Sequence, residues 1–149
     1  MKEQSFVILE SRLKQEGYSI TQQRQDVFKA ILDYGPLSLS EIIRRVAQKV
    51  DRVSVYRIVG LYESLGIVQR VNNGFKYKLE LSDSFTAHHH HLTCNECGKI
   101  ININENELEQ FINLIAKEKH FKPSSHQIEI QGRCIDCQSR ADRSATTPS

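Results

Sequence analysis

The sequence lacks the features that mark membrane and secreted proteins. No apolar run approaches the roughly 18 residues that span a bilayer, and residues 1–10 are charged at both ends, unlike a signal peptide. We therefore expect a cytoplasmic protein with no membrane partner. The zinc-hydrolase signatures H-E-x-x-H and H-x-E with P-C-x-x-C are also missing. Their absence favours a binding protein over an enzyme.

The sequence lacks a large excess of either charge, since the net charge is only +2. Residues 1–87 carry 13 Lys and Arg against 10 Asp and Glu, whereas residues 88–149 carry 7 against 8. Any surface that binds a polyanion should therefore lie in the first half. With 149 residues, of which 39% are hydrophobic, the chain can form one domain or two small ones. A core divided between two domains would be thin.

Cysteine is scarce, and its four copies form two C-x-x-C pairs, Cys94 with Cys97 and Cys134 with Cys137. In a reducing compartment such pairs indicate metal ligands before disulfides. Four thiolates complete a tetrahedral zinc site, which contributes directly to folding. The alternative is a pair of unliganded or redox-active dithiols. A thioredoxin-type dithiol requires a helix to begin after the pair, and the sequence shows no helix start after either one.

The first half has the hydrophobic periodicity of four helices followed by a β-hairpin. The third helix begins at a capping box formed by Ser38 and Glu41, and the fourth covers about residues 52–65. The dipeptide Asn73-Gly74 predicts a type I′ turn between two strands. We expect a winged helix-turn-helix domain over residues 1–82.

The fourth predicted helix carries an exposed Ser-x-Tyr-Arg segment. Its apolar positions face the core and leave Arg52, Tyr56 and Arg57 toward solvent, with Ser54 in the first turn. In a winged helix, such a helix enters the major groove of double-stranded DNA while the wing contacts phosphates. The alternative is a small helical domain in which Tyr56 and Arg57 are ordinary surface residues.

The second half predicts a small α/β unit over residues 88–138, so the fold class is α+β. Two strand-like segments flank a helix with one apolar stripe. The exposed strand edges of so small a unit are suited to pairing with a second copy, which predicts a homodimer. Residues 139–149 have no apolar face, and we expect a disordered tail there.

Four consecutive histidines, His88 to His91, precede the first cysteine pair. In a strand, alternate side chains face opposite sides, so His88 and His90 share one face while His89 and His91 share the other. The run therefore offers two separate pairs of ligands, each short of a complete site. A solvated low-complexity tract is the alternative.

Five short segments occur in a characteristic order and spacing. They are Thr21-x-x-Arg24, Ser54-Val55-Tyr56-Arg57, Leu65-Gly66-Ile67-Val68, His-x-His-Leu-x-Cys-x-x-Cys-Gly and the terminal C-x-x-C. Together they resemble the ferric uptake regulator family of bacterial metal-sensing repressors, over about residues 6–138. The resemblance implies a homodimer of winged-helix domains, each joined by a hinge, here residues 83–87, to an α/β dimerisation domain. It also implies repression of metal-homeostasis genes when a regulatory metal is bound.

The resemblance assigns two metal sites by position. The four cysteines correspond to the structural zinc site of the family. A second, regulatory site in the dimerisation domain corresponds to His88, His90, Glu109 and His126, and its ion would be Zn²⁺ or Fe²⁺. Three imidazoles and one carboxylate suit tetrahedral Zn²⁺, whereas Fe²⁺ prefers more oxygen ligands and higher coordination, so zinc is slightly favoured.

The hinge site of the family departs from its usual pattern in this chain. Pro36 stands where a histidine ligand is usual, and Asn102 occupies another ligand position, which argues against peroxide sensing by bound iron. An acidic ligand on the return strand aligns with Lys78 or, if the gap is moved, with Glu80. The resemblance thus leaves two alternatives. The hinge site is either altered, consisting of His89, His91 and Glu80, to which Asp83 or Ser84 could also add an oxygen, or it is lost.

At the DNA, we expect Tyr56 and Arg57 to contact bases or their methyl groups, and Ser54, Arg52, Thr21 and Lys76 to lie nearer phosphates. Two other functions stay open. One is a hydrolase that uses the His/Glu zinc site, although catalytic zinc keeps an open coordination position and four protein ligands leave none. The other is a zinc-buffering protein that binds no DNA.

Overall fold

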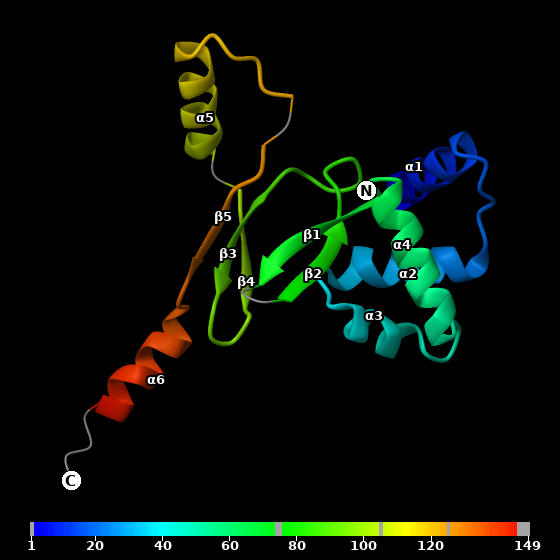
Figure 1. Ribbon diagram of the computed structural model, residues 1–149, viewed down its shortest axis with the longest axis horizontal. Helices are drawn as coiled ribbons and strands as arrows, with labels where there is room; N and C mark the ends of the chain where they lie inside the picture. The colour runs from blue at the N-terminus through cyan, green and yellow to red at the C-terminus, as the bar shows by residue number, and fades with distance from the viewer. Residues whose placement is uncertain (1, 74–75, 105, 125, 146–149) are drawn as a thin grey trace. The chain divides into compact units, whose positions relative to one another are not determined.

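The structure is a computed structural model that describes residues 2–73, 76–104, 106–124 and 126–145. The chain divides into two units, residues 1–87 and 88–149. The first unit contains four helices and a hairpin, and the second contains a three-stranded sheet and two helices (Figure 1). In chain order the elements are α1 (Lys2–Gln15), α2 (Gln22–Tyr34), α3 (Leu39–Val46), α4 (Arg52–Ser64), β1 (Val68–Asn73), β2 (Lys76–Leu81), β3 (His90–Cys94), β4 (Ile100–Ile103), α5 (Asn106–Glu118), β5 (Glu129–Gly132) and α6 (Ile135–Ala145).

Local capping signals fix where the helices of the first unit begin. The predicted capping box of α3 is confirmed, because the Ser38 side chain accepts from the Glu41 backbone N–H while the Glu41 carboxylate accepts from the Ser38 N–H. Thr21 caps α2 by accepting from the backbone N–H of Arg24. Each cap satisfies donors that the first turn of a helix leaves unpaired.

The core of the first unit is built around Phe28 of α2, which is fully buried. Its ring makes edge contacts with Phe6 of α1, Tyr62 of α4 and Phe85, at centroid distances of 5.2, 6.4 and 5.4 Å. The Tyr62 hydroxyl donates to the Arg24 carbonyl at 2.7 Å, which satisfies the polar end of an otherwise buried ring. Because Phe85 belongs to this core, the segment before the second unit is anchored to the first.

The wing is an antiparallel pair, β1 with β2, joined to the chain before α3. Leu37 and Leu79 exchange two backbone hydrogen bonds, of 2.9 and 2.7 Å, and so attach the hairpin to the helix-turn-helix. The last pair of the hairpin is Asn73 with Lys76, so Asn73 belongs to β1 and not to the turn. The prediction that Asn73 is a turn residue is therefore wrong, and Gly74 lies outside the described residues. In this register buried Val68 lies opposite buried Leu81, and such burial outweighs a local turn preference.

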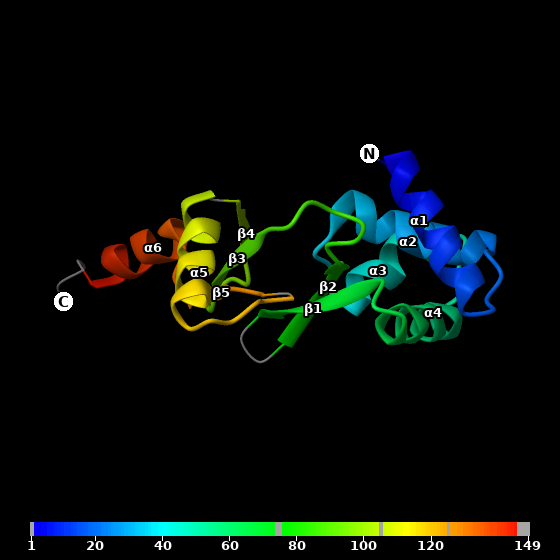
Figure 2. The same ribbon diagram turned by 90° about the horizontal axis from the view of Figure 1, so that it is seen from above.

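The second unit is a sheet of order β4-β3-β5, with β3 antiparallel to β4 and parallel to β5. Helix α5 lies beyond one end of the sheet and α6 beyond the other (Figure 1), and Figure 2 shows the same elements from above. Among its described residues this unit buries no aliphatic side chain; its buried residues are His90, His91, Thr93, Cys94 and Cys137. Apolar burial within one chain therefore contributes little to its stability.

Helix α6 corrects two expectations. A helix does begin at the second cysteine pair, at Ile135 directly after Cys134, and it continues to Ala145, so the prediction of disorder is wrong for residues 139–145. Residues 146–149 lie outside the described part of the chain. The start is favoured by Asp136 in the first turn, where a negative charge stabilises the helix dipole. A short polar helix of this kind has no apolar periodicity by which the sequence could reveal it.

No helix among the described residues has both the length and the apolar character needed to cross a membrane.

The capping box gives a pH-dependent stability prediction. Hydrogen bonds from the Ser38 hydroxyl and backbone lower the pKa of Glu41. Because the folded-state pKa lies below the unfolded value of about 4.3, this contribution is fully present above that pH and is lost as the pH falls through the folded-state value. Glu41→Gln should therefore cost about 0.5–1 kcal/mol near pH 7 and almost nothing near pH 2.

Urea unfolding followed by circular dichroism at both pH values measures this difference. Glu16→Gln, the same substitution at an exposed glutamate just after α1, serves as the control and should leave stability nearly unchanged. A Glu41→Gln cost that is equal at both pH values would show that the charged carboxylate has no part in the cap.

Candidate metal centres and recognition helix

The exposed face of α4 begins at an N-cap that the sequence analysis missed. The Asp51 side chain accepts from the Ser54 backbone N–H at 3.0 Å and from the Ser54 hydroxyl at 2.5 Å. These bonds lower the pKa of Asp51 and fix the first turn of the helix. An Asp directly before an apolar-periodic segment is the signal that could have identified it.

The residues expected at DNA lie on the outward side of α4. Arg52 donates to the Tyr56 hydroxyl at 3.3 Å, and Tyr56 is 47% exposed. Arg57 is exposed beside them, and so is Val53, whose 58% exposure the sequence analysis did not anticipate. This surface offers a guanidinium, a phenol and an apolar side chain together, which are the groups that read base edges and thymine methyl groups.

The other two expected DNA contacts are also exposed. The hydroxyl oxygen of Thr21, which was expected near a phosphate, accepts a hydrogen bond from the backbone N–H of Arg24 and so caps α2. Lys76 opens β2 and is exposed at the tip of the wing. Neither position is buried, but Thr21 has a role in the fold of the free chain as well.

The four cysteines meet at one end of the three-stranded sheet. Cys94 ends β3 and Cys134 follows β5. Because these two strands are parallel, both cysteines lie at the same end of the sheet. The Sγ atoms of Cys97 and Cys134 are 3.7 Å apart, and one sulfur from each cysteine lies within 4.8 Å of the others. Zn–S bonds of about 2.3 Å place the sulfurs of a tetrahedral site about 3.8 Å apart, so the cluster has the dimensions of a zinc–thiolate site.

Backbone amides prepare this cluster for a cation. The N–H groups of Cys97 and Cys134 donate toward Cys94 and lower the pKa of its thiol to about 6. Burial raises the pKa of Cys137, so this thiol keeps its proton until a metal displaces it. All four cysteines are reduced. Donor type, number and spacing thus fit a structural Zn²⁺ held by four thiolates.

Two ion pairs connect the two cysteine turns. Lys99, after the first turn, lies 3.1 Å from the carboxylate of Asp136 in the second, and Arg133, before the second, lies 2.7 Å from Glu96 in the first. The sequence analysis missed these pairs, because nothing local connects residues about 37 positions apart. Each pair is largely exposed, and each therefore orients the turns more than it stabilises them.

The second cluster lies at the opposite end of the same strand. His88 lies just before β3, His90 begins that strand, Glu109 belongs to α5, and His126 belongs to the segment before β5. The Glu109 Oε1 atom lies 2.8 Å from His90 Nε2, 3.2 Å from His126 Nε2 and 3.5 Å from His88 Nε2, and the Nε2 atoms of His88 and His126 are 3.1 Å apart. The structure thus brings together all four residues that the family resemblance assigned.

The dimensions of this cluster fit a bound divalent metal. Metal–nitrogen bonds of about 2.0–2.1 Å place the donor atoms of a tetrahedral site about 3.3 Å apart, and the four distances scatter around that value. Burial opposes ionisation of Glu109, but hydrogen bonds from His90 and His126 outweigh it and lower its pKa. Three neutral imidazoles and an ionised carboxylate are a ligand set for Zn²⁺.

The remaining two histidines form a pair on the other face of β3. The rings of His89 and His91 are 4.8 Å apart, and His91 is fully buried. Glu80 lies on β2 in the first unit, where it is buried and accepts from Gln69 at 2.8 Å. Since Glu80 and the two histidines belong to different units, the altered hinge site stays a prediction.

A winged helix joined to a unit with two metal-ligand clusters defines a metal-dependent transcriptional regulator. The chain belongs to the ferric uptake regulator family, whose sequence model matches residues 15–131. It is 34% identical over 134 residues to the ferric uptake regulation protein of Campylobacter upsaliensis, covering 84% of this chain and 83% of that protein. The corresponding protein of Bacillus subtilis is 28% identical, with coverage of 87% and 91%.

Among solved structures, the chain is similar to the Helicobacter pylori ferric uptake regulator Fur. The TM-score is 0.78 at 28% identity, and the match covers 93% of this chain and 94% of that one. The structure of that protein reveals three functional metal-binding sites. The likeness confirms the α+β class and the winged-helix arrangement that the sequence predicted.

The four-thiolate cluster predicts that the second unit loses its fold with its metal. Cys97→Ser changes an exposed ligand and should weaken zinc binding by at least about 100-fold. Backbone amides of β3 and β5 should then lose protection against hydrogen exchange, while the first unit, with its own core, keeps its protection. Mass spectrometry of exchanged peptides and zinc content per chain measure both effects.

Asn95→Ser is the matched control, since it introduces the same residue into the same turn at an exposed non-ligand position. It should leave zinc content and exchange unchanged. Full protection of β3 and β5 in zinc-free Cys97→Ser would mean that the metal does not hold this unit together.

Proposed function

We propose that this protein is a homodimeric repressor of metal-homeostasis genes, in which a divalent metal at His88, His90, Glu109 and His126 enables binding to a palindromic operator. The observation that carries the proposal is the convergence of Glu109 on three imidazole nitrogens within 2.8–3.5 Å. A metal there links β3, α5 and the segment before β5, which are otherwise joined by few apolar contacts. The ion is Zn²⁺ or Fe²⁺, and the ligand set favours Zn²⁺.

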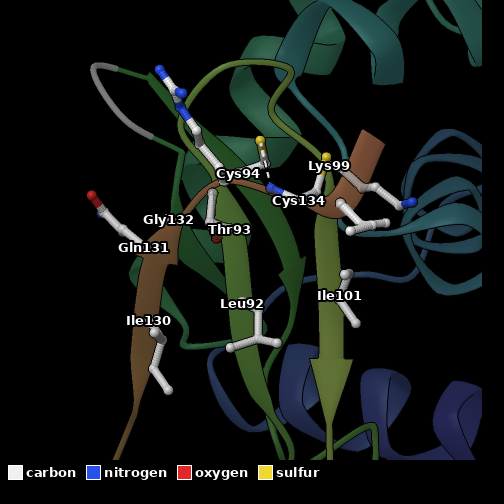
Figure 3. A pocket seen from close by; sticks show the side chains of 11 residues that line it. Leu92, Thr93, Cys94, Lys99, Ile101, Ile130, Gln131, Gly132 and Cys134 are labelled. Carbon is white, nitrogen blue, oxygen red and sulfur yellow. Dashed lines mark hydrogen bonds between the residues drawn. The ribbon is translucent and has the colours of Figure 1, made fainter. Parts of the chain in front are cut away.

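The apolar surface of the second unit supports a second copy as partner. The second unit exposes large apolar side chains; they are Ile101, Phe111, Leu114, Ile115, Phe121, Ile130 and Ile135. Figure 3 displays part of this surface, with Leu92, Ile101 and Ile130 lined along the sheet and Cys94 and Cys134 at its end. So much exposed apolar surface on a small unit is characteristic of a subunit interface.

The DNA partner follows from the first unit. A two-fold dimer presents two copies of α4, and two-fold symmetry in the protein requires half-sites related by a palindrome, about 34–36 Å apart along the duplex. Tyr56 and Arg57 contact bases, and Ser54, Arg52, Thr21 and Lys76 lie nearer phosphates. Reduced cysteine pairs and a chromosomal target both favour the cytoplasm as the site of action.

Metal and DNA affect one another through thermodynamic linkage. If metal favours the arrangement in which both recognition helices reach their half-sites, then DNA must raise the metal affinity by the same factor. The four-thiolate zinc has a different role, since it holds the second unit folded whether or not the regulatory metal is bound. His89, His91 and Glu80 would form a third, altered site whose occupancy modifies this response.

A selection from random double-stranded DNA tests the function. With the protein loaded with Zn²⁺ or Fe²⁺, we expect a palindromic sequence to be enriched, and with a chelator that spares the thiolate zinc we expect none. The ion that supports enrichment identifies the regulatory metal. A zinc-buffering protein would enrich no sequence with any metal.

Arg57 should contribute to the choice of sequence. Arg57→Ala is expected to cost about 1–3 kcal/mol on the selected duplex and less on unrelated duplexes, because a base contact is lost. Arg140→Ala, an exposed arginine on α6, is the matched control and should change neither affinity. Fluorescence anisotropy with labelled duplexes measures both, and an equal loss on every sequence would assign Arg57 to the phosphate backbone.

Glu109 should control the metal dependence of DNA binding. In the unmodified protein the regulatory metal is expected to tighten DNA binding by about 5–150-fold. Glu109→Ala should reduce that ratio to nearly 1 while one zinc per chain is retained at the cysteines. Glu107→Ala removes an exposed glutamate from the first turn of the same helix and should keep the full ratio. An undiminished ratio in Glu109→Ala would move metal sensing to another site.

A further inference from the structure

The recognition helix α4 contains a glycine, Gly60, in its interior. Glycine weakens a helix relative to alanine, because it loses more backbone freedom on folding. The positive φ that favours glycine occurs among the described residues at Gly17, Gly66 and Gly98, and not at Gly60. A Cβ atom added to Gly60 would meet no heavy atom within 4 Å beyond its own helix backbone. Neither backbone conformation nor packing in the described chain requires a glycine here.

Gly60 lies on the outward face of the helix. Residues three or four apart on a helix share a face, and Gly60 therefore follows Val53, Tyr56 and Arg57 in one exposed stripe. Val53 is 58% exposed and Tyr56 47%, whereas the opposite face, including Val59, is buried. The glycine thus interrupts the side chains of the surface that faces the DNA, one turn beyond Arg57.

We propose that Gly60 is the point where a sugar–phosphate strand of the bound duplex passes closest to α4, and that the missing side chain lets the helix enter the groove. This inference rests on the proposed DNA binding. The first turns of a recognition helix contact base edges, and Gly60 lies about 4.5 Å beyond Arg57 along the helix axis. At that point the helix leaves the floor of the groove and meets its wall.

The sizes of the two partners explain why one side chain matters. A helix with its side chains is about 10–12 Å across, and the major groove of B-DNA is about 12 Å wide. A side chain that faces the wall of the groove therefore has almost no free space. With glycine at position 60, the helix backbone can lie against the sugar–phosphate chain. A larger side chain at this position would hold the helix away from the bases.

Two enlarging substitutions in the full-length, metal-loaded protein test the inference. Gly60→Ala should raise the melting temperature by about 3 °C, because alanine favours the helix, and weaken binding to the selected duplex by about 10-fold. Gly60→Leu should also fold and should weaken binding by about 100-fold. Ser11→Ala, an exposed position on α1, is the control for helix propensity and should leave the duplex affinity unchanged. Thermal unfolding and fluorescence anisotropy provide the two measurements.

The results separate this inference from the proposed function. If the unmodified protein binds the duplex, Arg57→Ala weakens binding and Gly60→Leu binds within twofold of the unmodified protein, the inference is overturned while DNA binding stands. A lower melting temperature for Gly60→Ala would also overturn it, since Gly60 would then have a structural role. If the unmodified protein binds no duplex, both are overturned.

Discussion

The four-thiolate cluster is the interaction on which the second half of this protein depends. In the described part of that unit no aliphatic side chain is buried, and its buried residues are two cysteines, two histidines and a threonine. A sheet of three short strands with so little apolar burial cannot offset the conformational entropy lost on folding. Metal–thiolate bonds between the ends of β3 and β5 supply that stabilisation, and the proposed second copy would cover the apolar side chains that remain exposed.

Strand β3 connects this structural site to the regulatory one. His90 begins this five-residue strand and Cys94 ends it, so only three residues separate a ligand of the His/Glu cluster from the first cysteine. Strand β3 is held by the cysteine cluster at one end and by hydrogen bonds to β4 and β5 on its two sides. The histidines at its other end therefore alternate, with His88 and His90 toward Glu109 and with His89 and His91 away from it. Under the proposed function, zinc at the cysteines therefore preorganises the ligands of the regulatory metal.

Sequence predicted those parts that depend on local chemistry. The capping box of Ser38 and Glu41 was found because its residues are three apart, and the face of α4 was found because its period is that of a helix. Glu109 and His126 were assigned only through family resemblance, since nothing local distinguishes a ligand from a solvated side chain. The cross-pairs of Glu96 with Arg133 and Lys99 with Asp136, the wing register and α6 were missed, because each depends on contacts between distant residues or on a polar helix without periodicity.

The two units differ in what holds them together, and this difference constrains the regulation. The first unit has a complete aromatic and aliphatic core around Phe28, and its recognition helix is capped by Asp51 and anchored by the bond from Tyr62 to Arg24. Its folding therefore does not require the metal. In the proposed dimer, a metal that controls DNA binding must then act on how the two preformed recognition surfaces are arranged rather than on the folding of either one. The exposed face of α4 can accordingly be shaped for DNA alone, and a glycine that weakens the helix is tolerated there because the core on the opposite face compensates for it.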